Sequence, residues 1–175
     1  RTVAGELETV DLAYLDPPYN QHRYFTNYHI WETLVRWDAP EHYGIACKRI
    51  DSRDEGTKSP YNSRKTMPAE LRATIAAVNA RTLVVSYNNE SWVSADELLE
   101  WSAEGRETAE LLAFDSKRYV GAQIGIHNPS GKKVGKVSHL RNLEYVVVAG
   151  SESDVRRAVA AAPGQSVDIE QLMLT

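Results

Sequence analysis

The sequence predicts one α/β domain, in which a sheet carries helices on its faces and ends in antiparallel strands. The 175 residues suffice for a single domain with a sizeable core. Up to Gly105, short apolar stretches alternate with segments of helical periodicity, which is the pattern of a sheet with helical crossovers. Beyond Gly105 the apolar stretches follow one another, and this succession predicts the antiparallel C-terminal end.

The first strand is expected at residues 10–15, Val-Asp-Leu-Ala-Tyr-Leu. It must stop at Asp16, because the two prolines that follow cannot continue a hydrogen-bonded ladder. Residues 26–37 predict a helix with a broad apolar face, since their large apolar side chains recur at helical spacing. On this reading Trp31 and Trp37 are core residues.

Residues 38–67 contain prolines, glycine and many polar side chains without periodicity, so they predict a long loop of the kind that is usually functional. Pro68 suits the first turn of a following helix. That helix has an apolar stripe formed by Leu71, Ile75 and Val78. Residues 82–87 then predict a buried strand.

Ser94 and Glu97 form a capping-box pattern that opens another helix, and Gly105 closes it. The remaining elements are expected as strands at residues 108–114, 119–126 and 143–149, followed by a short helix at residues 152–162. Asp16 and Asn88 both lie just past the ends of expected strands, where open α/β sheets bind ligands.

The formal net charge of −4 argues weakly against nonspecific binding of nucleic acid, but the positive charges are concentrated. Residues 116–143 contain no acidic residue and six lysines and arginines. Three lysines in this segment are candidate contacts to DNA phosphates: Lys132, Lys133 and Lys136. The alternative is that the segment is an ordinary solvent-exposed surface. A second basic stretch at residues 48–65 is diluted by acidic side chains.

No apolar run approaches the roughly 20 residues of a membrane-spanning helix, so no membrane partner is expected. The single cysteine, Cys47, excludes an internal disulfide and fits a cytoplasmic protein, and a small buried side chain is the simplest reading of it. No metal site is expected, because the histidines lack ligand spacing. They are His22, His29, His42, His127 and His139.

The segment Asp16-Pro17-Pro18-Tyr19 has the residue types needed to activate an exocyclic amine such as that of adenine. The lone pair of this amine is delocalised into the ring, so both hydrogens must be held before the nitrogen can attack. The Asp16 carboxylate can accept one hydrogen, and a backbone carbonyl fixed by the prolines can accept the other. Tyr19 offers a flat face for a base extruded from the duplex.

The motif continues as Asn20-Gln21-His22-Arg23-Tyr24, and on this extended pattern the chain resembles the Dam-like, FokI-like class of N6-adenine DNA methyltransferases. The likeness resumes in four further blocks, at residues 27–34, 58–63, 85–90 and 139–145. The resemblance implies a partial Rossmann-like sheet that uses S-adenosylmethionine as methyl donor and no metal. It also implies site-specific methylation of adenine in DNA, as in restriction-modification systems, with Asp16, the Pro17 carbonyl and Tyr19 at the adenine and Asp16 beside the donor.

Several polar residues of these blocks are candidate contacts to DNA or substrate, and for most of them a purely structural role is the alternative. Asn20 and Tyr24 extend the motif. Ser59, Asn62 and Ser63 fit either the target pocket or a phosphate contact, and they fit a plain turn equally well. Tyr87 and Asn88 fit a contact to the base or cofactor, or the capping of a strand end.

The glycine-rich Phe-x-Gly-x-Gly loop, which holds the cofactor in this class, is missing from the sequence. Gly121 and Gly125 are too widely spaced and lie on the wrong side of Asp16. Residues 1–175 are therefore expected to be the C-terminal catalytic part of a methyltransferase domain, without the cofactor loop and the target-recognition segment. Such a part leaves one edge of the first strand open. An N-terminal half, a second chain or a homo-oligomer is expected to cover that edge.

Two other functions remain open at this point. One is a methyltransferase acting on RNA or on protein, since related motifs bind other planar amines. Measuring methyl transfer to DNA and to RNA distinguishes this alternative from a DNA methyltransferase. The other is a truncated, non-catalytic DNA-binding or interaction remnant, for which the missing glycine loop is the discriminating feature.

Overall fold

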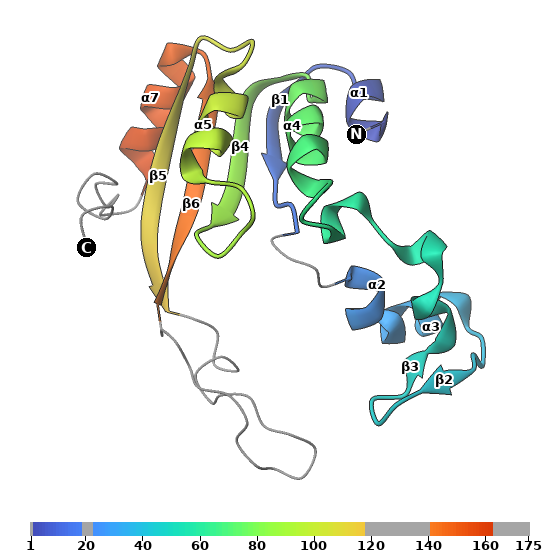
Figure 1. The fold of residues 1–175 in the computed structure, drawn as a ribbon. Helices are drawn as coiled ribbons and strands as arrows, with labels where there is room; N and C mark the ends of the chain where they lie inside the picture. The colour runs from blue at the N-terminus through green and yellow to red at the C-terminus, as the bar shows by residue number, and fades with distance from the viewer. Residues whose placement is uncertain (1, 19–22, 118–140, 163–175) are drawn as a thin grey trace.

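The computed structural model describes residues 2–18, 23–117 and 141–162. A four-stranded sheet in the order β1-β4-β6-β5 forms its centre (Figure 1). Its strands are β1 (Val10–Leu15), β4 (Ala80–Asn88), β5 (Thr108–Lys117) and β6 (Arg141–Gly150). β1 and β4 are parallel, whereas β6 runs antiparallel to both β4 and β5. The predicted α/β class with an antiparallel C-terminal end is confirmed.

Helices cover the two faces of the sheet unequally. α4 (Met67–Ala77) and α5 (Ala95–Ala103) lie on one face, and α7 (Glu152–Ala161) lies on the other face against β5 and β6 (Figure 1). α1 (Thr2–Glu6), which was not predicted, contacts α4. Among the described residues no helix has the length and apolar character needed to cross a membrane.

Local sequence signals set the ends of these helices. The predicted capping box is present: Ser94 Oγ accepts a hydrogen bond from the backbone N–H of Glu97, and Glu97 accepts one from the N–H of Ser94. Gly105 follows α5 with a positive φ of 72°, as predicted for a closing glycine. The expected strand at residues 119–126 lies outside the described residues, and β5 extends to Lys117.

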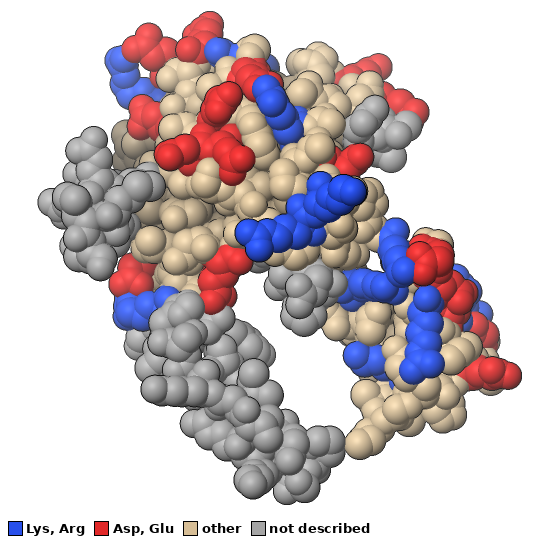
Figure 2. Space-filling view, viewed as in Figure 1, with Lys and Arg blue, Asp and Glu red and all other residues tan. Residues whose placement is uncertain are grey.

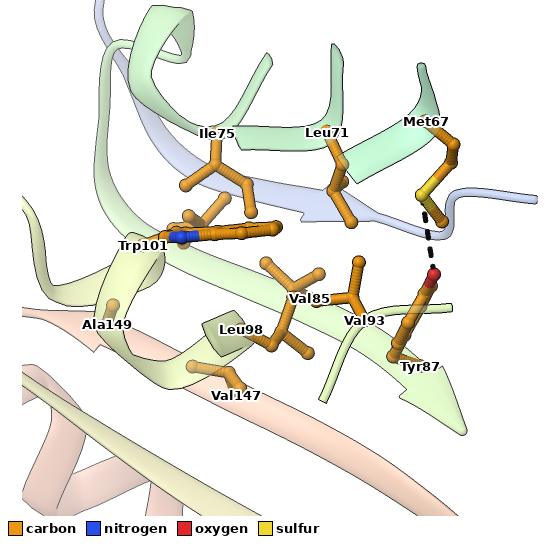
Figure 3. Close-up of a cluster of buried hydrophobic side chains, with 11 residues drawn as sticks. Met67, Leu71, Ile75, Val85, Tyr87, Val93, Leu98, Trp101, Val147 and Ala149 are labelled. Carbon is orange, nitrogen blue, oxygen red and sulfur yellow. Dashed lines mark hydrogen bonds between the residues drawn. The ribbon is translucent and has the colours of Figure 1, made fainter. Parts of the chain in front are cut away.

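The core lies between β4 and the helices α4 and α5 (Figure 3). Leu83, Val85 and Tyr87 are fully buried and alternate with half-buried side chains, as a strand with one covered face requires. The Tyr87 hydroxyl donates to Met67 Sδ over 3.6 Å. Burying each large apolar side chain contributes about 1.5 to 3 kcal/mol to stability. The other side chains of this cluster are Leu71, Ile75, Val93, Leu98, Trp101, Val147 and Ala149.

The opposite face of β1 has no such cover. Ala13 and Leu15 pack against the core, but Leu12 and Tyr14 on the other face are 60% and 62% exposed. Within the described residues β1 is also the edge strand of the sheet, because its only partner is β4. An apolar edge strand of this kind tends to associate with other chains.

Residues 23–66 form a lobe that lies apart from the sheet (Figure 1). The helix predicted at residues 26–37 is split at Tyr28 into α2 (Tyr24–Asn27) and α3 (His29–Arg36). The predicted loop contains the short strands β2 (His42–Tyr43) and β3 (Lys48–Arg49). Three 3₁₀ helices complete the lobe, at Ile50–Arg53, Glu55–Thr57 and Pro60–Asn62.

A buried arginine holds the lobe together. The side chain of Arg49 is 3% exposed and forms hydrogen-bonded ion pairs with Asp38 at 2.6 Å and Asp51 at 2.8 Å. These bonds from Arg49 hold the pKa of Asp38 and of Asp51 below the ordinary value of 3.8. Because both pKa values are lowered by folding, the pairs stabilise the lobe at neutral pH and lose this effect as the pH falls through the folded-state values.

Two expectations of burial in the lobe are wrong. Trp31 on α3 and Trp37 directly after it are 63% and 85% exposed, because no second layer among the described residues covers this part of the lobe. Cys47 is also exposed, since it lies with a positive φ of 46° in the turn that joins β2 to β3.

Gly150 permits the close approach of β6 to β4. A Cβ at this position would lie 2.6 Å from the backbone oxygen of Arg81, which cannot move without disturbing the sheet. We expect Gly150→Ala to lower the free energy of unfolding by about 1 to 3 kcal/mol through overpacking. A lower urea midpoint at unchanged slope is the measurement.

Gly56→Ala is the matched control, because a Cβ there meets no atom within 4 Å. It should change stability by no more than about 0.5 kcal/mol. Equal urea midpoints for the two variants would contradict the packing assigned to Gly150.

Candidate active site

Asp16 lies at the carboxyl end of β1, where the chain leaves the sheet. Pro17 is buried and Pro18 half-buried, so the backbone of this turn is fixed both by packing and by the proline rings. β1 and β4 are parallel neighbours, so their carboxyl ends lie side by side. This is the edge at which open α/β sheets bind ligands.

The Asp16 carboxylate is held from the neighbouring strand. Ser86 Oγ, on β4, donates a hydrogen bond to Asp16 Oδ1 over 3.1 Å. The Tyr14 hydroxyl, on β1, donates to Ser86 Oγ over 2.9 Å. Ser86 lies within the 85–90 block that carried the sequence resemblance, but neither it nor Tyr14 was expected at the site.

A cavity of about 200 Å³ borders the Asp16-Pro17-Pro18 segment. Its other walls come from β1, from the 3₁₀ helix at Pro60–Asn62 and from α4, through the side chains of Tyr14, Leu15, Tyr61, Leu71 and Thr74. The cavity is smaller than the roughly 300 to 1,000 Å³ of typical small-molecule sites, so it suits a single ring better than a whole cofactor.

Tyr61 ties the lobe to the wall of this cavity. Its hydroxyl lies 2.6 Å from Thr74 Oγ1 and donates to the backbone oxygen of Glu70 over 3.1 Å. Burial raises the pKa of Tyr61, the hydrogen bond with Thr74 opposes that rise, and the charge of Glu70 adds to it. Tyr61 was missed at the sequence level, although it stands between the expected residues Ser59 and Asn62.

A second carboxyl group lies near the same edge. Glu144 on β6 pairs with Asn88 on β4. Burial raises the pKa of Glu144, a hydrogen bond from Ser116 opposes this, and the charges of Asp16 and Glu90 raise it further. The carboxyl groups of Asp16 and Glu144 therefore lie close enough at this edge for their charges to interact.

The polar residues expected in the 58–63 block form a turn. Ser59 Oγ accepts from the N–H of Tyr61 over 3.2 Å, and Asn62 Oδ1 accepts from the N–H of Ser59 over 3.4 Å. Ser63 follows the 3₁₀ helix and is exposed. Ser59, Asn62 and Ser63 do not line the cavity.

The two candidates at the end of β4 also have structural contacts. Tyr87 is fully buried in the core and presents no surface to DNA (Figure 3). Asn88 is 8% exposed, and its Oδ1 accepts from the N–H of Glu90 over 3.1 Å, which caps the strand end. Tyr24, at the start of α2, lies away from the cavity and packs against the ring of Tyr28.

The other expected contacts cannot be placed at the site. Tyr19, Asn20, Lys132, Lys133 and Lys136 lie outside the described residues. Among the residues that the structure does describe, no group of three or more His, Cys, Asp or Glu side chains is arranged to hold a metal ion.

Lysines and arginines gather on the lobe and at its junction with the sheet (Figure 2). Arg64 and Lys65 are exposed and lie between α4, which begins at Met67, and the 3₁₀ helix that ends at Asn62 and contributes Tyr61 to the cavity. Others have local partners: the guanidinium of Arg53 lies 3.8 Å from the centre of the Tyr43 ring, and Lys58 pairs with Glu55. Arg64 and Lys65 thus form a basic surface near the site, whereas Arg49 of the same basic stretch is buried.

Comparison with known proteins decides the family. The profile of the D12 class of N6 adenine-specific DNA methyltransferases matches residues 2–99, which is more than half of the chain. This chain belongs to the D12 class. The matched part contains β1, Asp16, the lobe, α4 and β4, and therefore every wall of the cavity.

Curated relatives include two DNA-modification-type enzymes by name, a modification methylase and a type II methyltransferase, both with longer chains. The modification methylase LlaI of Lactococcus lactis subsp. lactis is 34% identical over 155 residues, covering 83% of this chain and 24% of its own length. The type II methyltransferase M.FokI of Planomicrobium okeanokoites is 36% identical over 90 residues, covering 50% of this chain and 13% of its own. The chain thus spans a quarter or less of these relatives. No solved structure matches it.

Proposed function

We propose that this chain carries the adenine-holding part of an enzyme that transfers a methyl group from S-adenosylmethionine to the N6 amine of adenine in DNA. The observation that carries the proposal is the Asp16-Pro17-Pro18 turn at the carboxyl end of β1, beside a cavity of about 200 Å³. Membership of the D12 class and the modification methylases among the relatives support it.

In the proposed reaction the chain's own groups orient the amine. The Asp16 carboxylate and the Pro17 carbonyl accept its two hydrogens, and the ring of Tyr19 stacks on the extruded base. S-adenosylmethionine, when bound, supplies an electrophilic methyl group on a positively charged sulfur. A carboxylate suits that positive charge, and Asp16 is the group we place beside it.

DNA is the proposed substrate, and the basic surface beside the cavity is its proposed backbone contact. Arg64 and Lys65 stand next to the segment that contributes Tyr61, so phosphates flanking an extruded base would pass close to them. Lys132, Lys133 and Lys136 remain proposed phosphate contacts from the acid-free segment. Site-specific modification in the cytoplasm, as part of a restriction-modification system, is the setting we propose.

Cofactor binding is proposed to need a further polypeptide segment along β1. The sequence has no glycine-rich loop, β1 has no partner on its outer side among the described residues, and Leu12 and Tyr14 are exposed on its uncovered face. A segment that adds a strand there would complete the sheet and bring a cofactor loop beside Asp16. We propose that this segment is an N-terminal half of the same methyltransferase fold.

We expect Asp16→Ala to abolish methyl transfer in the enzyme that contains this chain and its cofactor-binding part. Loss of one preorganised electrostatic contact lowers turnover by about two to three orders of magnitude. Transfer of tritiated methyl groups to DNA is the measurement.

Asp11→Ala is the matched control, because it removes a carboxylate from the same strand whose side chain is 90% exposed. It should leave turnover near that of the unchanged enzyme. Near-normal turnover of Asp16→Ala would refute the role of Asp16, and methyl transfer to RNA but not to DNA would refute the proposed substrate.

The open edge of β1 leads to a second expectation. Residues 1–175 alone should bind S-adenosylmethionine weakly or not at all in calorimetry, and should self-associate in light scattering. Addition of the cofactor-binding half should restore binding and a monomeric catalytic unit. Micromolar binding of the cofactor by a monomer of the 175 residues would contradict this division of the fold.

A further inference from the structure

Three side chains form a hydrogen-bonded chain on the uncovered face of the sheet. The Tyr14 hydroxyl donates to Ser86 Oγ over 2.9 Å, and Ser86 Oγ donates to Asp16 Oδ1 over 3.1 Å. The backbone oxygen of Leu15 lies farther from Ser86 Oγ, at 3.5 Å. A serine hydroxyl has one proton to donate, and its oxygen here already accepts the proton of Tyr14. The Ser86 proton can therefore go either to Asp16 or to the backbone oxygen of Leu15, and the shorter distance favours Asp16.

The register of the sheet creates this chain. Leu15 on β1 pairs with Val85 on β4, and both point into the core. The next residues along the two strands, Asp16 and Ser86, therefore point to the opposite face, where Tyr14 also lies. Tyr14 is 62% exposed, so its side chain is not needed to fill the core.

We propose that Ser86 is a positioning residue for Asp16 and that Tyr14 orients the Ser86 hydroxyl. The inference rests on the proposed function, in which Asp16 accepts a hydrogen of the adenine amine. Ser86 holds Oδ1 and so sets the plane of the carboxylate. That plane determines the direction in which the lone pairs of Asp16 meet the amine.

The energetic basis is the charge on the acceptor. A hydrogen bond to an ionised carboxylate is roughly twice as strong as one between neutral groups. Donation from Tyr14 polarises the Ser86 hydroxyl and strengthens its bond to Asp16. Productive geometry at a site must hold within about 0.5 Å and 10 to 20°. The hydrogen bond from Ser86 is one restraint that keeps the Asp16 carboxylate within such limits.

The first test is kinetic and uses the same enzyme preparation as the Asp16 measurement. We expect Ser86→Ala to lower kcat for DNA methylation about tenfold, as loss of one hydrogen bond to a charged group does, with KM for DNA unchanged. Ser86→Thr keeps the hydroxyl and should restore most of the rate. Tyr14→Phe should lower kcat less than Ser86→Ala does. Because Tyr14 is exposed, loss of its hydroxyl should leave the fold intact, so misfolding would not explain a lower kcat.

Thr82→Val is the control for this series. Thr82 lies on the same strand and the same face as Ser86, and none of the described hydrogen bonds involves its hydroxyl. Its kcat should stay at the wild-type value. A wild-type kcat for Ser86→Ala, or an equal loss in Ser86→Thr, would overturn the positioning role.

The second test does not depend on turnover. In crystals of the enzyme that contains this chain and its cofactor-binding part, the Asp16 carboxylate should keep one rotamer in the wild type and in Ser86→Thr, and should leave it in Ser86→Ala. An unchanged Asp16 rotamer in Ser86→Ala would overturn the inference. If wild-type enzyme does not methylate DNA, the proposed function fails, and the crystals still decide whether Ser86 positions Asp16.

Discussion

The parallel pairing of β1 with β4 is the constraint on which the candidate site depends. It aligns the carboxyl ends of two strands that are separated by about seventy residues of sequence, and it sets Asp16 beside Ser86. The pairing is stable because Leu15 and Val85 both join the core formed with α4 and α5. The same core therefore fixes the direction of β1 and the starting point of the Asp16-Pro17-Pro18 turn.

The two faces of β1 serve different purposes. The covered face packs against the core, whereas the uncovered face carries the polar chain from Tyr14 to Asp16. Apolar side chains are exposed on β1 and on α3 of the lobe, and contiguous apolar patches mark interaction sites. This pattern agrees with a family in which the chain covers only a quarter or less of the relatives described above.

Local signals in the sequence predicted much of the sheet and little of the lobe. The two prolines after Asp16 predicted the end of β1, and the Ser94–Glu97 pair predicted the start of α5, because both act within one turn of the chain. Helical periodicity identified the apolar face of α3, but periodicity cannot show whether another layer covers that face, and Trp31 is exposed. Ser86 was missed because its role depends on strand register, which brings it to a residue 70 positions away.

The most direct test of the account is the chemical identity of the methylated product. DNA from cells that express the intact coding sequence containing these residues would be digested to nucleosides and analysed by mass spectrometry. The account predicts N6-methyladenine in DNA, and its disappearance when Asp16 is replaced by alanine. Methyl groups found on cytosine, on RNA or on protein, or N6-methyladenine that persists without the Asp16 carboxylate, would contradict it.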